Sequence, residues 1–508
     1  MRSSDGRTPE FTELTESLEQ NILGIRGSMG CSPDLVIRHL VLAEHTGAAL
    51  LYVDGMVDMQ VLHQSVLGAL VGKAPAEVFK AQSPDEQLDY LMKHVLAAAD
   101  VNIASDSGSL LKNLLSGSAV FLLEGSAKFI SITAPGWEER AVSEPNSQAV
   151  VRGPMEGFTE NLRTNTTLIR RRIKDSRLWM ENFEIGRTTK TNVTIMYLQH
   201  LVNTEVLEEV RRRLNAIDTD SILESGYIEE FIQDKRITPF PTIYNTDRPD
   251  TAAADILEGK VAILVDGTPF VLLVPTFFIT FLQSAEDYYQ RSDIATLLRF
   301  IRFLAFTIVI LAQAVYIALT TYHQEMIPTT LVISLAAQRE RVPFPAFVEA
   351  MFMEITYEIL REAGVRIPKN IGQAISIVGT LVIGQAAVDA GFISSAMVII
   401  VSITAIASFV IPEMGMSISA RIIRFILMAL AAFIGLYGIL FGLILLVLHL
   451  TSLRSFGVPY MSPLGPIVPN DLKDSLFRFP WTSLRTYPKG NQPKTLKRQW
   501  GRKGDSES

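Results

Sequence analysis

The stretch from Ile371 to Ile411 constrains the fold of this chain most, because its 41 residues contain one ionisable side chain, Asp389. A bilayer core of about 30 Å takes about 20 apolar residues per helical crossing, so this length fits two crossings. Asp389 is followed by Ala390 and Gly391. Asp and Gly tolerate turn conformations, and a charge between two crossings would lie near the lipid headgroups. The stretch therefore predicts a transmembrane helical hairpin that turns at residues 389–391.

Two further apolar segments predict more crossings on either side of this hairpin. Phe303–Tyr322 contains no charged residue, and Arg291, Arg299 and Arg302 precede it. Arginines on the leading side of a first span indicate a cytosolic N-terminus, because cytoplasmic flanks carry an excess of basic residues. Phe425–Leu450 is also apolar and predicts one last, long span.

Residues 323–370 leave the number of crossings open. Four spans place both soluble ends in the cytosol, but they place Arg421 and Arg424 on the far side, against the same tendency. The helix predicted after Pro343-Phe344-Pro345 is too charged to face lipid, yet apolar enough to lie at an interface or inside an assembly. A partial or re-entrant segment within 323–370 would resolve the conflict.

The N-terminal half predicts an α/β unit that occurs twice. In the first copy, Ala49–Asp54 has a buried-strand pattern, Asp58 caps a helix, and Ala119–Glu124 and Lys128–Thr133 form a hairpin. The second copy repeats these features in the same order, with Val193–Tyr197, Asn203, Val261–Val265 and Phe270–Val274.

The two copies also keep their spacing. Asp58 corresponds to Asn203 at an offset of 145 residues, and Gly125 corresponds to Gly267 at an offset of 142. We infer a duplicated subdomain, with chance similarity of two α/β units as the alternative. The predicted fold class is an α/β soluble N-terminal half of two related subdomains, followed by an all-α polytopic transmembrane domain.

These patterns divide the chain into six predicted parts. They are a flexible N-terminal segment (1–30), a cytosolic α/β subdomain 1 (31–150), a connecting linker and helix (151–190), a cytosolic α/β subdomain 2 (191–290), a helical membrane domain (291–455) and a cytosolic basic C-terminal tail (456–508).

Composition excludes several classes of function. The net charge is −7 and only 19% of the 508 residues are charged, which gives no basic field for nucleic acid. The single cysteine excludes an intramolecular disulfide and a cysteine-rich metal site. The chain has no P-loop, zinc-protease or serine-hydrolase motif. We therefore expect a non-enzymatic protein without a cofactor, and we expect no cleavable signal peptide. The run Arg170, Arg171 and Arg172 is expected on a solvated face, with phosphate or lipid contact as the alternative.

Polar residues inside the apolar half are the candidate functional residues, because burying them in lipid is unfavourable unless they meet partners or water. The candidate ion path consists of Gln313, Glu354, Glu358, Gln385 and Asp389. The alternative is hydrogen bonding between helices, with the two glutamates solvated or bridged to Arg361. The candidate helix-packing residues are Gly372, Ser376, Gly379, Gly435, Gly438 and Gly442, since small residues let helices approach closely.

Several long segments carry a family resemblance. They are Lys235–Asp250, Glu258–Phe270, Glu286–Tyr289, Val342–Glu349, Leu360–Gly364, Ile383–Val388 and Leu453–Tyr460. With these segments the chain resembles the GerA family of bacterial spore germination proteins, specifically the A subunits of nutrient germinant receptors. The resemblance covers about residues 30–485.

The resemblance implies a function and a set of partners. It implies a multi-pass subunit of the spore inner membrane that acts with a transporter-like B subunit and a lipoprotein C subunit. It also implies a homo-oligomer whose membrane part conducts ions when nutrient binds, in contact with membrane lipid. The alternatives are a paralogous channel acting with the dipicolinate-release machinery, a secondary transporter, and a scaffold subunit.

Overall fold

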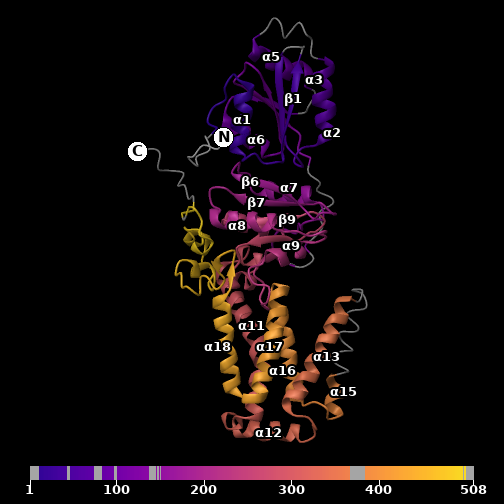
Figure 1. Ribbon diagram of the computed structural model, residues 1–508, viewed down its shortest axis with the longest axis vertical. Coiled ribbons are helices and arrows are strands. Elements are labelled where there is room, and N and C mark those ends of the chain that lie inside the picture. The colour runs from indigo at the N-terminus through magenta and orange to yellow at the C-terminus, as the bar shows by residue number, and fades with distance from the viewer. Residues whose placement is uncertain are drawn as a thin grey trace.

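The structure is a computed structural model that describes residues 11–42, 46–73, 83–96, 100–136, 145, 148, 150–366, 384–495 and 497–498. Two sheet-containing units are stacked end to end on a bundle of helices, so that the molecule is elongated (Figure 1). The predicted division into a sheet-rich N-terminal half and a helical C-terminal half with apolar helices is confirmed.

The first unit is a five-stranded antiparallel sheet with helices on both faces. Its strands lie in the order β1 (Leu35–Leu42), β2 (Thr46–Val53), β4 (Ser118–Leu123), β5 (Phe129–Thr133) and β3 (Val101–Ala104). One face packs on α1 (Leu18–Ser28) and α6 (Ser107–Leu114). The other face packs on α2 (Met59–Val61), η1 (Leu62–Leu67), α3 (Gly68–Lys73), α5 (Pro84–Tyr90) and η2 (Leu91–Val95). Alternate residues of β2 therefore serve two separate cores.

The second unit repeats the same sheet. Its strands lie in the order β6 (Leu178–Ile185), β7 (Thr191–Leu198), β9 (Val261–Val265), β10 (Val271–Val274) and β8 (Tyr244–Thr246). The helices α7 (Leu162–Arg172) and α10 (Pro249–Leu257) cover one face, and α8 (Thr204–Asn215) and α9 (Ser225–Ile232) cover the other. An identical strand order in both sheets supports the inferred duplication.

The central strands and helix caps follow the sequence prediction, whereas the outer strands do not. Asp58 and Asn203 cap their helices with side-chain oxygens, and both predicted hairpins are present. The sequence patterns do not predict the strands β1, β3, β6 and β8, because β3 and β8 are only four and three residues long and β1 and β6 contain exposed positions.

Both predicted flanking segments pack against the sheet units. The prediction of a flexible segment over 1–30 fails for residues 11–30, because α1 buries Leu18, Ile22 and Ile25 against the first sheet. The tail from residue 456 contains β12 (Val458–Pro459), which pairs with β11 (Arg454–Ser455), and η7 (Asp471–Asp474), η8 (Trp481–Ser483) and η9 (Lys489–Asn491). The tail lies beside the second unit (Figure 1) and buries Tyr460 completely.

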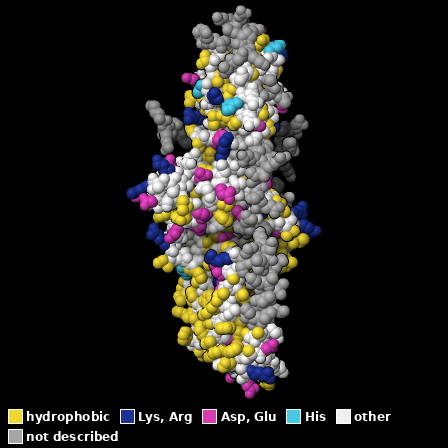
Figure 2. Space-filling view, turned by 90° about the vertical axis from the view of Figure 1, so that its right-hand side faces the viewer, with side chains coloured by type: hydrophobic (Ala, Val, Ile, Leu, Met, Phe, Trp, Pro, Cys, Tyr) yellow, Lys and Arg dark blue, Asp and Glu magenta, His cyan; other side chains and the backbone are white. Residues whose placement is uncertain are grey.

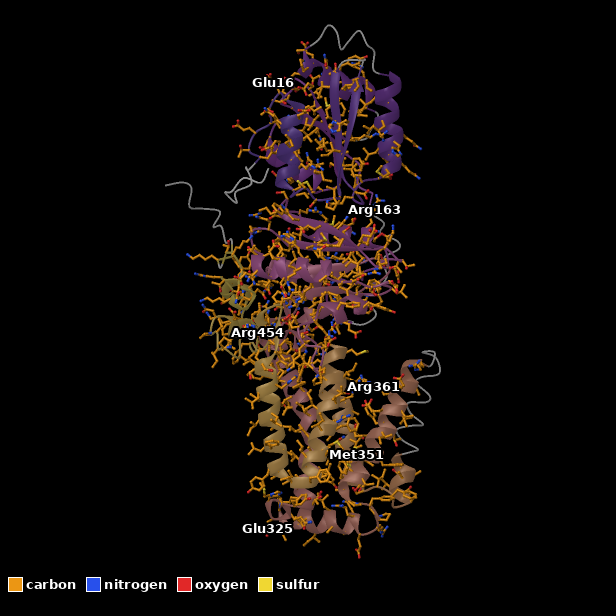
Figure 3. The ribbon with its side chains drawn as sticks, viewed as in Figure 1. Glu16, Arg163, Glu325, Met351, Arg361 and Arg454 are labelled. Carbon is orange, nitrogen blue, oxygen red and sulfur yellow. The ribbon has the colours of Figure 1, made fainter. Side chains whose placement is uncertain are left out.

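Arg170 joins the two sheet units. Its Nε lies 2.7 Å from Asp34 Oδ2 and its Nη1 lies 2.9 Å from the Leu178 carbonyl oxygen, and the residue is 1% exposed. The predicted solvated face is therefore wrong at this position, because a carboxylate and a carbonyl satisfy the buried guanidinium. Arg163, which pairs with Asp54 of the first unit, lies at the same junction (Figure 3).

In the described part of the helical half, four helices run antiparallel and a side element lies beside them. The helices are α11 (Ser292–Thr321), α16 (Ser395–Val410), α17 (Met414–Ile434) and α18 (Leu436–Ser452), and the side element contains α13 (Ala346–Arg366) and α15 (Gly384–Asp389). The short segments η3 (Phe278–Leu282) and η4 (Ala285–Tyr288) precede α11, while η5 (Gln324–Met326) and α12 (Thr329–Arg339) follow it. Figure 1 shows α12 lying across the end of the bundle farthest from the sheets, hereafter the far end.

The predicted single span over Phe425–Leu450 is wrong. Gly435 ends α17 with φ = +69° and starts α18, so the segment is a helical hairpin whose turn lies at the far end. Tyr322, just after α11, donates to the Ala432 carbonyl oxygen at 2.7 Å and fixes this end. Glycine adopts a positive φ readily, which explains why the apolar run turns there.

The topological conflict over Arg421 and Arg424 disappears with this correction. The helix α17 begins at the end of the bundle next to the sheets, hereafter the sheet-side end, where Ser419 donates to the Pro239 carbonyl oxygen. The two arginines therefore lie in the half of α17 that is nearer the sheet-side end, and not in a loop at the far end. Four helices in alternating directions return the chain to the sheet-side end, where Arg454 lies (Figure 3).

Candidate functional site

A cluster of polar side chains lies between α11, α13 and α17, and we call it the bundle cluster. It consists of Gln313, Glu354, Glu358, Arg421 and Arg424. Gln313, Glu354 and Arg424 are each fully buried. Three of the five predicted path residues are thus brought together, and two arginines complete the group.

Glu354 is the centre of the bundle cluster. It accepts from Gln313 Nε2 on one oxygen and from Arg424 on the other. Glu358, one turn along α13, accepts from Arg421 and lies 3.5 Å from Arg424. These contacts join helices, as in the alternative prediction, but the cationic partners of the two glutamates are Arg421 and Arg424 and not Arg361.

The bundle cluster is electrically balanced but not fully hydrogen-bonded. Two carboxylates face two guanidinium groups, which is the arrangement that makes burial of charge tolerable. Gln313 Oε1, Arg421 Nε and Arg424 Nε are buried without a hydrogen-bond partner among the described residues. Arg424 lies ten residues from the end of α17, about 15 Å at 1.5 Å per residue, so the cluster lies near mid-bundle.

Gln385 and Asp389 lie elsewhere. Both are exposed on α15 near the far end, and Gln385 Nε2 lies 3.2 Å from Asp389 Oδ1. Gly391, with φ = +70°, follows as the predicted turn before α16. The structure therefore separates these two candidates from the bundle cluster.

The candidate packing residues fall into three groups. Gly372, Ser376 and Gly379 lie outside the described residues. Gly435 forms the turn between α17 and α18. A Cβ on Gly438 would lie 2.3 Å from the Leu430 carbonyl oxygen, a backbone atom, so this site requires a small residue. A Cβ on Gly442 would lie 2.5 Å from Leu427 Cδ2, the end of a side chain that can move aside.

A second charged group, the junction cluster, anchors the start of α11. Asp287 of η4 is fully buried and pairs with Arg299 at 3.0 Å and with Arg302 at 2.8 Å. Arg299 also donates to the Asp474 and Phe477 carbonyl oxygens of the tail, at 2.7 and 3.1 Å. These contacts tie the second sheet unit, the tail and the bundle to one helix.

Sequence reasoning missed the roles of these arginines. It treated Arg299, Arg302, Arg421 and Arg424 as flanking charges that report orientation. A signal was nevertheless present, because Glu354 and Glu358 are four residues apart on one helix and Arg421 and Arg424 are three apart on another. Such spacings place each pair on one helix face, ready to meet the other.

Length and composition single out two of the described helices as able to cross a bilayer, α11 and α17, whereas α16 and α18 are apolar but shorter. Hydrophobic side chains gather over the helical half of the visible face (Figure 2). The described residues hold no group of three or more His, Cys, Asp or Glu side chains able to bind a metal ion.

Comparison with known proteins identifies the family. The family model described as Bacillus/Clostridium GerA spore germination protein matches residues 24–490. The chain belongs to the GerA family. It is 48% identical to spore germination protein KA of Bacillus subtilis (strain 168), over 92% of this chain and 85% of that protein.

Other relatives of the GerA family agree. The chain is 38% identical to spore germination protein GerLA of Bacillus cereus, over 96% of this chain and 98% of that protein. It is 41% identical to a protein of Bacillus subtilis (strain 168) named as the uncharacterised membrane protein YfkQ, over 97% of this chain and 94% of that protein. A crystal structure of the N-terminal domain of the A subunit of the Bacillus megaterium spore germinant receptor GerK3 is 37% identical, with a TM-score of 0.42, over 52% of this chain and 97% of that one.

Proposed function

We propose that this GerA-family chain is a membrane subunit of a spore germinant receptor and helps convert nutrient binding into ion release. It acts in the spore inner membrane with its sheet units in the cytosol, beside a transporter-like B subunit and a lipoprotein C subunit, and as a homo-oligomer. The observation that carries the proposal is the bundle cluster, in which Glu354 and Arg424 are both fully buried among apolar helices.

Ionisable groups inside a membrane bundle are unfavourable, face the interior of the bundle and mark ion or proton paths. The helices α11 and α17 are long and apolar enough to cross a bilayer, and a purely hydrophobic anchor would not need these five polar residues. Their presence therefore favours a transport role over a purely hydrophobic anchor.

In this arrangement the path is closed, and α13 is the element that would open it. Glu354 and Glu358 belong to α13, while their arginine partners belong to α17. Moving α13 outward would separate the ion pairs and hydrate the carboxylates. A partner that binds nutrient more tightly in one of the two packings would bias this equilibrium. Gln385 and Asp389 would line the far-end mouth.

The alternative with specific support is a scaffold, because every charged side chain of the bundle cluster has an opposite charge within 3.5 Å. In a scaffold the cluster would only hold α13 in register. Liposomes containing the purified chain separate the candidates. Ion flux without solute exchange supports a channel, and saturable solute uptake supports a transporter. The absence of both activities supports a scaffold.

A double substitution separates path from scaffold inside the spore. Arg424→Met alone leaves Glu354 buried without its cation, which should destabilise the protein by about 3–5 kcal/mol. Glu354→Met with Arg424→Met replaces the whole pair by apolar side chains, which is often neutral or stabilising. We expect the double variant to assemble at a normal level but to lose or delay nutrient-triggered ion release, measured as cation efflux from spores.

The matched control changes a solvated ion pair on the same helix. Glu362 and Arg366 pair on the exposed side of α13, and Glu362→Met with Arg366→Met should leave ion release unchanged. If spores with the buried double variant release ions at the normal rate, the bundle cluster has only a structural role and the proposed path is wrong.

A further inference from the structure

Four aromatic side chains form an exposed group where the C-terminal tail meets α11, and we call it the aromatic patch. It consists of Phe300, Phe477, Phe479 and Trp481, each between 41% and 47% exposed. The rings of Phe300 and Phe477 lie 5.6 Å apart and those of Phe477 and Phe479 lie 6.3 Å apart, both edge to face. Exposed apolar patches mark sites of contact with a partner or a membrane.

The aromatic patch continues an exposed apolar stripe on α11. Leu297, Phe300, Ile301 and Leu304 are all exposed, and their spacings of three and four residues place them on one face of the helix. The stripe leads directly into the uncharged run Phe303–Tyr322. In the proposed membrane placement lipid covers this stripe, so the same leaflet is the nearest occupant for the patch beside it.

The height of the aromatic patch along the bundle matches a membrane surface. Phe300 lies 21 residues before Thr321, the last residue of α11, which is about 32 Å at 1.5 Å per residue. The hydrocarbon core of a bilayer is about 30 Å thick. With Thr321 at the far boundary of this core, Phe300 lies at the sheet-side boundary, where aromatic side chains of membrane proteins are enriched.

The tail segment that carries the patch is fixed on α11. Arg299 of α11 donates to the Phe477 carbonyl oxygen at 3.1 Å. The Arg478 backbone N–H donates to Thr296 Oγ1 at 3.0 Å, and the Arg478 guanidinium lies 5.0 Å from the ring centroid of Trp481. The patch is therefore presented on an ordered backbone, which lowers the entropic cost of binding a surface.

The charge of the tail suits an anionic membrane surface. The sequence contains no acidic residue between Ser475 and Lys503. The exposed basic side chains among the described residues of this segment are Arg485, Lys489, Lys494 and Lys497. Basic segments that adjoin a membrane span are attracted to the phosphate groups of anionic lipids.

We propose that the aromatic patch docks the C-terminal tail on the headgroup layer of the bilayer, and that anionic lipids strengthen this docking. Phe477, Phe479 and Trp481 lie at the boundary between headgroups and acyl chains, beside Phe300 of the first membrane helix, while the basic side chains that follow meet lipid phosphates. The inference rests on the membrane placement in the proposed function. It goes beyond that function because it assigns the tail a membrane contact of its own.

The test places a fluorescent reporter in the patch. Phe479→Trp adds a tryptophan and keeps the site aromatic. The full-length chain is reconstituted in vesicles of phosphatidylcholine and phosphatidylglycerol, with or without bromine atoms on the acyl chains close to the headgroup. Bromine quenches tryptophan at short range, so the fluorescence that Phe479→Trp adds should fall in the brominated vesicles. Val41→Trp is the matched control, because Val41 is an exposed apolar residue of the first sheet unit, and its added fluorescence should not change.

Only vesicles that keep the chain through an alkaline carbonate wash are assayed, so that the two proposals fail separately. Loss of the chain in the wash would contradict the membrane placement and, with it, the proposed function. Retention of the chain without quenching of Phe479→Trp would overturn the docking of the tail alone. Shielding of that tryptophan from both the brominated lipid and aqueous acrylamide would identify a protein, such as a second copy of the chain, as the occupant, and would also overturn lipid docking.

Two further variants, each carrying the Phe479→Trp reporter, separate the aromatic and the basic contributions. Phe477→Ser should lower the ratio of docked to undocked tail about fivefold, the effect of withdrawing part of one phenylalanine side chain from an apolar layer. Arg485→Gln with Lys489→Gln should lower the ratio about fivefold for each cation, and only in vesicles that contain phosphatidylglycerol. Quenching that is unchanged in both variants would contradict docking through this patch.

Discussion

At the scale of single residues, the close approach of helices depends on positions where a side chain has no room. Gly438 lies under the Leu430 carbonyl oxygen and Gly442 lies against Leu427, so α17 and α18 approach through glycine. Gly364 on α13 is different, because a Cβ there would meet nothing within 4 Å. The same residue type therefore has opposite sensitivity to substitution at two places in one bundle.

Gly438→Ala should destabilise the solubilised protein by about 1–3 kcal/mol, the usual effect of overpacking, because a backbone atom must shift to admit the methyl group. Gly364→Ala should be neutral or stabilise it by up to about 1 kcal/mol through helix propensity. Thermal unfolding in one detergent measures both variants. Equal unfolding temperatures for the two variants would contradict the packing role of Gly438.

At the scale of elements, α11 connects the sheet units to the bundle. Its first turns contribute Arg299 to the junction cluster, and its middle supplies Gln313 to the bundle cluster. Tyr322, just after its last turn, donates to the Ala432 carbonyl oxygen near the end of α17. A rotation or shift of α11 would therefore change the contacts of both clusters. This makes α11 the element through which a change in the sheet units can reach α13.

Asp287→Asn tests this connection. The substitution leaves Arg299 and Arg302 buried with less negative charge, and removing one partner of a buried ion pair typically destabilises by about 3–5 kcal/mol. We expect a lower unfolding temperature and faster proteolysis of the tail, whose carbonyl oxygens Arg299 holds. Asp293→Asn, at a solvated ion pair in the first turn of α11, is the control and should change neither. Protection of the tail in both variants would show that Asp287 does not anchor it.

At the scale of the whole molecule, two surfaces of different character follow one another along the long axis. On the face shown in Figure 2, charged side chains lie over the sheet units and the far end, and apolar side chains gather over the described part of the bundle between them. Such a belt between polar zones is expected of a chain that crosses a bilayer. The single core cluster that runs from α7 and α10 into the bundle makes the second sheet unit and the bundle one body.

The full-length chain should accordingly stay with the membrane fraction after washing with alkaline carbonate or high salt, and detergent should release it. Both washes remove proteins that are held by charge alone, because they screen or neutralise surface ion pairs. Immunoblotting of the washed fractions measures the outcome. Recovery of a folded monomer in the wash without detergent would contradict the membrane placement and, with it, the proposed ion path.

The sequence by itself determined whatever depends on local pattern: the central hairpins of both sheets, the caps at Asp58 and Asn203, the duplication, and the apolar character of the second half. These features arise from alternation, turn residues and capping atoms that lie within a few positions of one another. The family also followed from long segments of sequence.

Only the tertiary structure decided which distant groups meet. Local pattern could not pair Glu354 with Arg424, separate Gln385 and Asp389 from them, dock the tail against the second sheet unit, or bury Arg170 against Asp34. The physical reason is that burial of a charge depends on its partner, and here the partners lie 70 or more residues away. A single positive-φ glycine, Gly435, then set the direction of the last two helices.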